Sequence, residues 1–362
     1  MSPKVLVLHA YSAHNRGDGL LVDRSIALLR EAFGADVQLE MVASYPESFS
    51  YLGIPVYCAK PGRSGWNREY LRVLRRLNSY DLIVGVGGGC LRAGHPVEMA
   101  KTLLVMGPQI FAAGAARTPS VYLPQSIGPF RCGSAYLFRY LVGRITSYML
   151  RDARSLAEIR QSNCVRLPDL ALTSPEFTQA VRGFSEVDVD DTVVFTARAV
   201  HGSLPPGVRE LYARLRQSDI PVVGFIQSAV GGNNDTEVQR SLTGAAEITP
   251  AEYLRQGPEY PARVVVAVRL HAALMALQAG HYVIHLAYER KGFAAFEDAG
   301  LSPWVHNVNT FDPECVLEQV KTLLTDETAR AEYRKKVRER CDYLERCHAE
   351  MIEILQASVS QQ

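Results

Sequence analysis

Short apolar runs alternate along this chain with longer stretches in which apolar residues recur at helical spacing. Runs of β-branched and aliphatic residues without polar alternation are typical of strands buried on both faces, as in a parallel sheet. The pattern predicts strands at 5–9, 37–42, 81–86, 120–123, 192–197, 221–226, 264–268 and 282–287. It predicts helices at 19–33, 68–77, 97–115, 206–217 and 271–279, and a mainly helical chain from residue 311 onward. Strand alternating with helix indicates an α/β fold with parallel, doubly wound sheets.

An acidic, turn-rich stretch, GFSEVDVDD at 183–191, interrupts the alternation before it starts again. A chain of 362 residues exceeds the usual size of a single core, so two domains are expected. We predict a Rossmann-like domain at 1–184, a second at 190–310 and a C-terminal helical segment at 311–362. Two Rossmann-like domains that face each other across a cleft are the simplest architecture for this pattern.

The second predicted domain places cationic residues just beyond three of its strands. Arg198 follows the strand at 192–197, Arg269 and His271 follow the strand at 264–268, and Lys291 comes shortly after the strand at 282–287. Ligands of open parallel sheets bind beyond the carboxyl ends of the strands, so these residues are candidates for a site that holds a small polyanion. The alternative is a set of surface ion pairs and a histidine that only starts a helix.

The first predicted domain has glycine-containing loops at the corresponding strand ends. Asn15-Arg16-Gly17-Asp18-Gly19 leads into a helix, where Asp18 is either a functional carboxylate or the N-cap. Gly87-Gly88-Gly89 indicates a close approach of the chain or of a ligand. Neither loop has G-x-G-x-x-G spacing, which argues against a dinucleotide site. Gln125-Ser126 lies in a loop flanked by prolines that suits the wall of a cleft.

Composition limits the partners. Lys and Arg (39) nearly balance Asp and Glu (38), so the chain as a whole does not favour nucleic acid or an acidic membrane. Anion binding must therefore come from local clusters. Seven cysteines without C-x-x-C spacing argue against a disulfide framework and a structural zinc site, and we expect no metal. We predict no signal peptide and no transmembrane segment, so the expected location is the cytoplasm.

These motifs together resemble the polysaccharide pyruvyl transferase family, over about residues 5–305. The matching residues occur in the expected order: Asn15-x-Gly17-Asp18, Gly87-Gly88-Gly89, Leu123-Pro124-Gln125-Ser126-x-Gly128-Pro129, Arg151-Asp152-x-x-Ser155, Pro168-Asp169, Arg269-Leu270-His271 and Tyr288-x-x-Lys291. One departure concerns the residue after the Gly-Asp pair, which is acidic in many relatives and is Gly19 here. If that residue contacts the acceptor, the acceptor of this protein is unusual.

The resemblance implies a GT-B-like fold and a ketal-pyruvyltransferase. Such an enzyme moves the enolpyruvyl unit of phosphoenolpyruvate onto two hydroxyls of a sugar, which gives a pyruvate ketal and phosphate. Phosphoenolpyruvate is then a co-substrate, and no other cofactor is expected. The acceptor stays open: a polysaccharide unit, a sugar of a secondary metabolite, or a lipid-linked or nucleotide-linked sugar.

The resemblance also implies roles for individual residues. Arg198 and Arg269 would hold the phosphate and carboxylate of phosphoenolpyruvate, with Lys291 adding positive charge. His271 would protonate the methylene carbon or assist the departure of phosphate, and Asp18 is the candidate base for the hydroxyls. The acceptor side would be shaped by Asn15, Gly17, Gly87, Gly88, Gly89, Gln125 and Ser126.

Three other functions compete with this one. A nucleotide-sugar glycosyltransferase of the same architecture would need an acidic residue at the end of a strand in the second domain, and Glu289 keeps that option open. A non-catalytic anion-binding protein of the same fold is the second alternative, although Arg269-Leu270-His271 argues against it. An NAD enzyme is disfavoured because both glycine loops lack the dinucleotide spacing.

Overall fold

The computed structural model describes residues 2–63, 65–131, 133–184, 188–200, 202–229, 234–244 and 261–360. The chain forms two compact units. Unit 1 consists of Met1–His14, Asp18–Leu170 and Arg346–Gln362, and unit 2 of Asn15–Gly17 and Ala171–Glu345. Residues 185–187 of the predicted acidic link lie outside the described residues.

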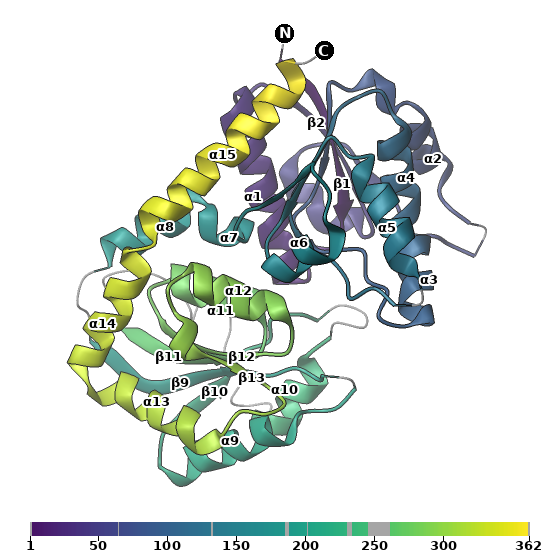
Figure 1. Ribbon diagram of the computed structural model, residues 1–362. Coiled ribbons are helices and arrows are strands. Elements are labelled where there is room, and N and C mark those ends of the chain that lie inside the picture. Colours follow the sequence, from purple (N-terminus) through teal and green to yellow (C-terminus); the bar gives the residue numbers. More distant parts are fainter. Residues whose placement is uncertain are drawn as a thin grey trace. The chain divides into compact units, whose positions relative to one another are not determined.

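A parallel sheet with helices on both faces forms the centre of unit 1 (Figure 1). Its strands are β1 (Lys4–Ala10), β2 (Gln38–Ala43), β3 (Val56–Cys58), β4 (Leu82–Gly85), β5 (Gly88–Gly89), β6 (Ser120–Ser126), β7 (Ser147–Leu150) and β8 (Cys164–Arg166). They are arranged in the order β3-β2-β1-β4-β6-β7-β8, with β5 beside β6. Strands β2 and β3 lie on one side of β1, and β4 to β8 lie on the other side. The strand order in the sheet therefore reverses between β1 and β4.

Helices cover both faces of this sheet. They are α1 (Arg16–Phe33), α2 (Arg68–Arg75), α3 (Pro96–Val105), α4 (Gly107–Ala115), α5 (Ser134–Gly143) and α6 (Ala153–Ile159), with the short 3-10 helices η1 (Pro46–Leu52) and η2 (Leu77–Ser79). Figure 1 shows α1 and the end of α15 (Cys341–Ser360) on one face, and α2, α4 and α5 on the other. Among the described residues, no helix combines the length and the apolar character needed to cross a bilayer.

Helix α15 contributes to both units. Its first five residues, Cys341–Glu345, belong to unit 2, and the remainder belongs to unit 1. There it packs on α1: Met351 and Leu355 are fully buried, and His348 is 2.8 Å from the Glu31 carboxylate. The C-terminal helix is therefore part of the core of unit 1.

Unit 2 contains a second parallel sheet. Its strands are β9 (Val189–Thr196), β10 (Val222–Gly224), β11 (Ala262–Ala267), β12 (Tyr282–Ala287) and β13 (Val305–Asn307), in the order β10-β9-β11-β12-β13. Its helices are α7 (Leu170–Thr173), α8 (Pro175–Gly183), α9 (Pro206–Gln217), α10 (Thr236–Thr243), α11 (Leu270–Gln278), α12 (Arg290–Asp298), α13 (Pro313–Thr325) and α14 (Glu327–Arg338), with the 3-10 helix η5 (Ser302–Trp304). Helices α9 and α13 cover one face and α11 and α12 the other (Figure 1).

The prediction of an α/β fold with parallel sheets and C-terminal helices is confirmed, and each of the eight predicted strands is present. Two details were wrong. The helix predicted at 97–115 is divided into α3 and α4 because Pro108, which lacks an N–H, begins a new helix after Met106. The loop predicted after Leu123 is instead a continuation of β6 to Ser126, with a shift in the register between Tyr122 and Gln125.

Two buried histidines lie at β12: His285 is within this strand, and His281 directly precedes it. The ring of His281 accepts a hydrogen bond from the Arg263 N–H, at 3.2 Å. The Nδ1 atom of His285 is 2.7 Å from the Ala267 carbonyl, which can only accept, so Nδ1 carries the proton. His285 also stacks on Phe296. Burial lowers the pKa of His285 from 6.5 to about 4, and nearby Lys291 acts in the same direction.

The buried histidine makes unit 2 sensitive to acid. Unfolded His285 binds a proton below its ordinary pKa of 6.5 and the folded form only near 4, so stability falls as the pH drops between these values. From about pH 7.5 to about pH 5, we expect the wild type to lose about 2 kcal/mol more than the variant His285→Asn, which does not titrate. Urea unfolding in a Trp66→Phe background measures this, because Trp304 of unit 2 is then the sole tryptophan. Equal losses in the two proteins would contradict a neutral His285.

Candidate functional site

The carboxyl ends of three neighbouring strands meet at one edge of the sheet in unit 2. Ala267 of β11 pairs with Thr196 of β9 on one side and with His285 of β12 on the other. Arg198, Arg269 and Lys291, which follow these strands, are therefore carried to the same edge. Helix α11 starts directly after Arg269, so its N-terminal N–H groups lie at this edge and favour an anion there.

Arg269 is held by a buried ion pair. Its Nε and Nη2 atoms donate to the two carboxylate oxygens of Asp235, the second at 2.7 Å. The two side chains are only 9% and 3% exposed, so the pair is shielded from water. Burial raises the pKa of Asp235, whereas Arg269 and, more weakly, Arg198 oppose this shift. The sequence pattern gives no sign of Asp235, which stands before α10 and 34 residues from its partner.

The other two cations surround Tyr288. Arg198 donates to the Tyr288 hydroxyl, and its guanidinium lies 4.7 Å from the centre of the ring. The ammonium of Lys291 is 2.9 Å from the carboxylate of Glu289 and 6.0 Å from the same ring. The structure thus brings the three predicted cations to one edge, but with two carboxylates among them. The net positive charge of this cluster is therefore lower than that of the three predicted cations alone.

His271 lies in the first turn of α11 and is partly buried. Within unit 2 it is close to the segment Asn15–Gly17: a Cβ atom on Gly17 would be 2.6 Å from His271 Nδ1. The Asn15 side chain accepts a hydrogen bond from the Gly17 N–H, and Arg16 N–H donates to the Gln227 carbonyl. Gly17 is therefore required by the close approach of the histidine ring, a reason that the sequence did not reveal.

Asp18 is not the N-cap that the sequence allowed. Helix α1 begins at Arg16, so Asp18 is the third residue of its first turn, and the oxygen of Asn15 provides the cap. The charge of Asp18 contributes, after burial and Tyr45, to raising the pKa of Tyr11. At the next position a Cβ atom on Gly19 would be 3.2 Å from the Cα atom of Ala13. A side chain at residue 19 would thus crowd the backbone of the preceding loop.

The triple glycine lies against the end of β6. Gly88 and Gly89 pair with Gln125 and Ser126, and a Cβ atom on Gly87 would be 3.1 Å from the Pro124 carbonyl oxygen. The close approach indicated by these glycines is thus one of chain to chain. Gln125 is almost fully buried, donates to the Val86 carbonyl at 2.7 Å and accepts from the Tyr148 hydroxyl.

The remaining motif residues of unit 1 form a buried polar network. The Ser126 hydroxyl accepts from Nε of Arg151 at 2.9 Å, and Arg151 also pairs with Asp169. Asp152 caps α6 by accepting from the N–H and hydroxyl of Ser155. These hydrogen bonds fix the loops after β6, β7 and β8 relative to one another. The side chains of Gln125 and Ser126 thus bond to the chain itself at the end of β6, and their place in a cleft wall stays a prediction.

One further polar residue, which the sequence pattern did not indicate, lies near a strand end. His9 lies near the end of β1, beside β4, where the strand order of the first sheet reverses and ligands of such sheets bind. Its φ of +69° is unusual for a residue other than glycine. Its Nε2 atom is 2.9 Å from the Tyr122 hydroxyl, and burial lowers its pKa to about 3. A neutral imidazole has one nitrogen that donates and one that accepts a hydrogen bond, so His9 offers both at this position without adding a positive charge.

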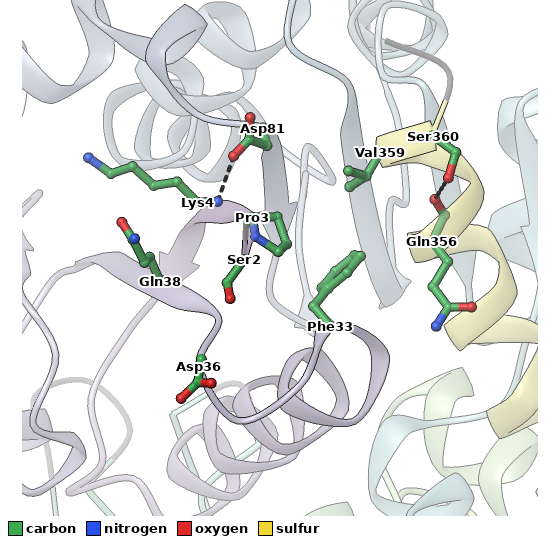
Figure 2. A pocket seen from close by; sticks show the side chains of 10 residues that line it. All are labelled: Ser2, Pro3, Lys4, Phe33, Asp36, Gln38, Asp81, Gln356, Val359 and Ser360. Atoms are coloured by element: carbon green, nitrogen blue, oxygen red, sulfur yellow. Dashed lines mark hydrogen bonds between the residues drawn. The ribbon is translucent and has the colours of Figure 1, made fainter.

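A pocket of about 1000 Å³ in unit 1 lies at the opposite edge of the first sheet. Figure 2 shows Lys4 and Gln38, at the starts of β1 and β2, together with Asp81 and the α15 residues Gln356 and Ser360. The Lys4 N–H donates to Asp81 at 2.7 Å. Since ligands of open parallel sheets bind at the carboxyl ends, this pocket is not the candidate site.

The ion pair at the edge of unit 2 gives a prediction for stability. Asp235→Ala leaves a buried guanidinium without its counter-charge, so we expect it to lower the free energy of unfolding by about 3–5 kcal/mol. The matched control Glu289→Ala removes a more exposed pair, at 14% and 25%, and should cost about 1 kcal/mol or less. Urea denaturation of both variants measures the difference. If both variants lose the same amount, Asp235 does not hold Arg269 as described.

Comparison with solved structures supports a GT-B-like fold. The Anabaena protein HepE (Alr3699), solved with UDP-glucose, shares 15% identity and a TM-score of 0.59, with 97% of this chain and 99% of that chain covered. A putative UDP-N-acetylglucosamine 2-epimerase from Listeria monocytogenes shares 10% identity and a TM-score of 0.59, over 100% and 98% of the chains. A glycosyltransferase from Rickettsia africae shares 10% identity and a TM-score of 0.57, with both chains fully covered. At these identities the likeness concerns the fold alone.

No curated protein matches the chain by sequence. The family model of the polysaccharide pyruvyl transferases matches residues 15–250, from the loop after β1 to beyond α10. Because this match covers well over half of the chain, the protein belongs to the polysaccharide pyruvyl transferase family.

Proposed function

We propose that the protein transfers the enolpyruvyl unit of phosphoenolpyruvate to two hydroxyls of a sugar acceptor, forming a pyruvate ketal and releasing phosphate. One observation carries this proposal. At one edge of the second sheet, three adjacent parallel strands are followed by four candidate residues: Arg198, Arg269, Lys291 and His271. Membership of the pyruvyl transferase family supports this reaction class. The cations match a small donor with a phosphate and a carboxylate.

Each cation has a distinct part in donor binding. Arg269, held by Asp235, offers a guanidinium in a fixed position, so little conformational entropy is lost when an anion binds. Arg198 and Lys291 lie beside Tyr288 and add charge from the ends of the neighbouring strands. Planar guanidinium groups suit the forked oxygens of phosphate and carboxylate.

His271 supplies the proton in the proposed reaction. Transfer of its proton to the methylene carbon of phosphoenolpyruvate leaves a cationic C2, which one sugar hydroxyl attacks to form the first C–O bond. The second hydroxyl then displaces phosphate, and the phosphate leaves with the electron pair of its C–O bond. Gly17 sets the space beside the imidazole.

Two hydroxyl protons must be removed during ketal formation. We assign one to Asp18, a carboxylate in the first turn of α1, as the proposed base. The other proton can be taken up by His271, which has already given its own proton to the methylene carbon. The backbone at Gly87–Gly89 and at the Gln125–Ser126 end of β6, held by the network around Arg151, would shape the acceptor side.

We propose phosphoenolpyruvate as the co-substrate, without a metal or another cofactor, and a sugar or glycan as the acceptor. We also propose a cytoplasmic location. The described cysteines are free thiols, which is the usual state in a reducing compartment.

A nucleotide-sugar glycosyltransferase is the second candidate. It is favoured by the fold likeness to a protein solved with UDP-glucose and by Glu289 directly after β12. However, Glu289 lies 2.9 Å from Lys291, so one of its two carboxylate oxygens is already engaged in an ion pair.

Ligand-dependent stabilisation separates the two functions. Phosphoenolpyruvate at about 100 times its Kd should stabilise the protein by about 2.7 kcal/mol, whereas UDP, GDP and NAD should have no effect. Thermal unfolding with EDTA present measures the shift without metal. Stabilisation by a nucleotide alone would replace the proposed function with that of a glycosyltransferase.

The role of His271 can be tested by substitution. His271→Ala should retain the binding of phosphoenolpyruvate but lose at least about 100-fold in acceptor-dependent phosphate release, because it removes the acid. The control His306→Ala changes a histidine of β13 that lies beside Gln319 and should remain active. Phosphate release against a panel of sugars gives the measurement. Turnover of the His271 variant at the wild-type rate would exclude this residue as the acid.

A further inference from the structure

Large apolar side chains gather on three consecutive helices of unit 1. Of the seven such side chains that are exposed among the described residues, five lie on these helices. They are Val97 and Leu104 on α3, Phe111 on α4, and Tyr136 and Tyr140 on α5. We call these five residues the α3–α5 patch.

The helical spacing places the patch away from the core. Tyr136 and Tyr140 are four residues apart and so share a face of α5, while Phe138, between them, is fully buried. On α3, Val97 and Leu104 lie seven apart on one face, and Met99 and Leu103 pack against the core instead. Helix α3 packs on α4 and α4 on α5, so the exposed faces belong to neighbouring helices (Figure 1). The core of unit 1 is complete without these five side chains.

The same region carries a strong excess of positive charge. Residues 91–145 contain six basic residues, Arg92, Lys101, Arg117, Arg131, Arg139 and Arg144, and a single acidic one, Glu98. The carboxylate of Glu98 accepts a hydrogen bond from the Gly94 N–H. Lys101, Arg117, Arg131 and Arg144 are exposed. The whole chain has a formal charge of +1 and this segment alone has +5, so the remaining residues together carry −4.

We propose that the α3–α5 patch docks unit 1 on the surface of an anionic lipid bilayer. Apolar side chains interleaved with cations are the pattern of peripheral membrane binding, in which the former enter the headgroup region and the latter attract anionic lipids. Tyrosine is enriched at membrane interfaces because its ring is apolar and its hydroxyl polar. A second copy of the chain fits less well, because a two-fold contact through this patch would place like charges opposite one another.

Docking would change where the enzyme works. A surface-bound enzyme meets an acceptor that is itself attached to lipid at a high local concentration. The α3–α5 patch belongs to unit 1 and the proposed donor site to unit 2, so a variant can lose vesicle binding and still bind phosphoenolpyruvate, or the reverse.

Vesicle flotation of the full-length protein tests the proposal. We expect binding to phosphatidylcholine vesicles with about one third phosphatidylglycerol, and weaker binding in high salt or without the anionic lipid. The double variant Leu104→Ser, Phe111→Ser should lower the partition coefficient at least about tenfold. The control Tyr51→Ser removes an exposed aromatic side chain from η1, outside the patch, and should bind like the wild type.

A charge reversal provides the second arm. Lys101→Glu, within the patch, should weaken binding to the anionic vesicles, whereas Arg346→Glu makes the same charge change on exposed α15 and should not. Circular dichroism verifies that each variant is folded. Absence of binding to anionic vesicles, or equal binding by all variants, would overturn the proposal. A dimer that the Leu104→Ser, Phe111→Ser variant dissociates would assign the patch to a second copy instead.

Discussion

The buried ion pair between Arg269 and Asp235 is the interaction on which the candidate site depends. Arg269 follows the central strand of the second sheet and precedes α11, so its position also determines where His271 lies. Asp235 keeps the guanidinium from turning into solvent. A group that is already oriented and desolvated costs little reorganisation when charge develops beside it. The pair therefore provides preorganisation rather than free positive charge.

The sequence was sufficient for the frame of the molecule and for part of the site. Fully buried strands leave a simple signal of β-branched runs, and the parallel arrangement places whatever follows them at one edge. For this reason Arg198, Arg269 and Lys291 could be brought together before the structure was known. Asp235 could not be found in this way, because its pairing with Arg269 depends on how α10 packs beside the sheet. The same holds for Gly17, whose small size matters only where His271 comes close.

The predictions for unit 1 were less accurate because polar residues at the ends of strands have several uses. Gln125, Ser126 and Arg151 read equally well as ligand contacts or as structural supports. The structure shows that their side chains bond to the chain itself. His9 was overlooked because it ends an apolar strand, and neither its positive φ nor its contact with Tyr122 leaves a trace in the sequence.

Helix α15 has a consequence for how the protein is made. The core of unit 1 includes Met351 and Leu355, yet these residues follow the whole of unit 2 in the chain. During synthesis on the ribosome, the face of the first sheet that α1 covers therefore stays incomplete until α15 emerges. Unit 2 is complete by Glu345 and can fold earlier, although most of it is translated later than the strands of unit 1. The order of folding need not follow the order of translation.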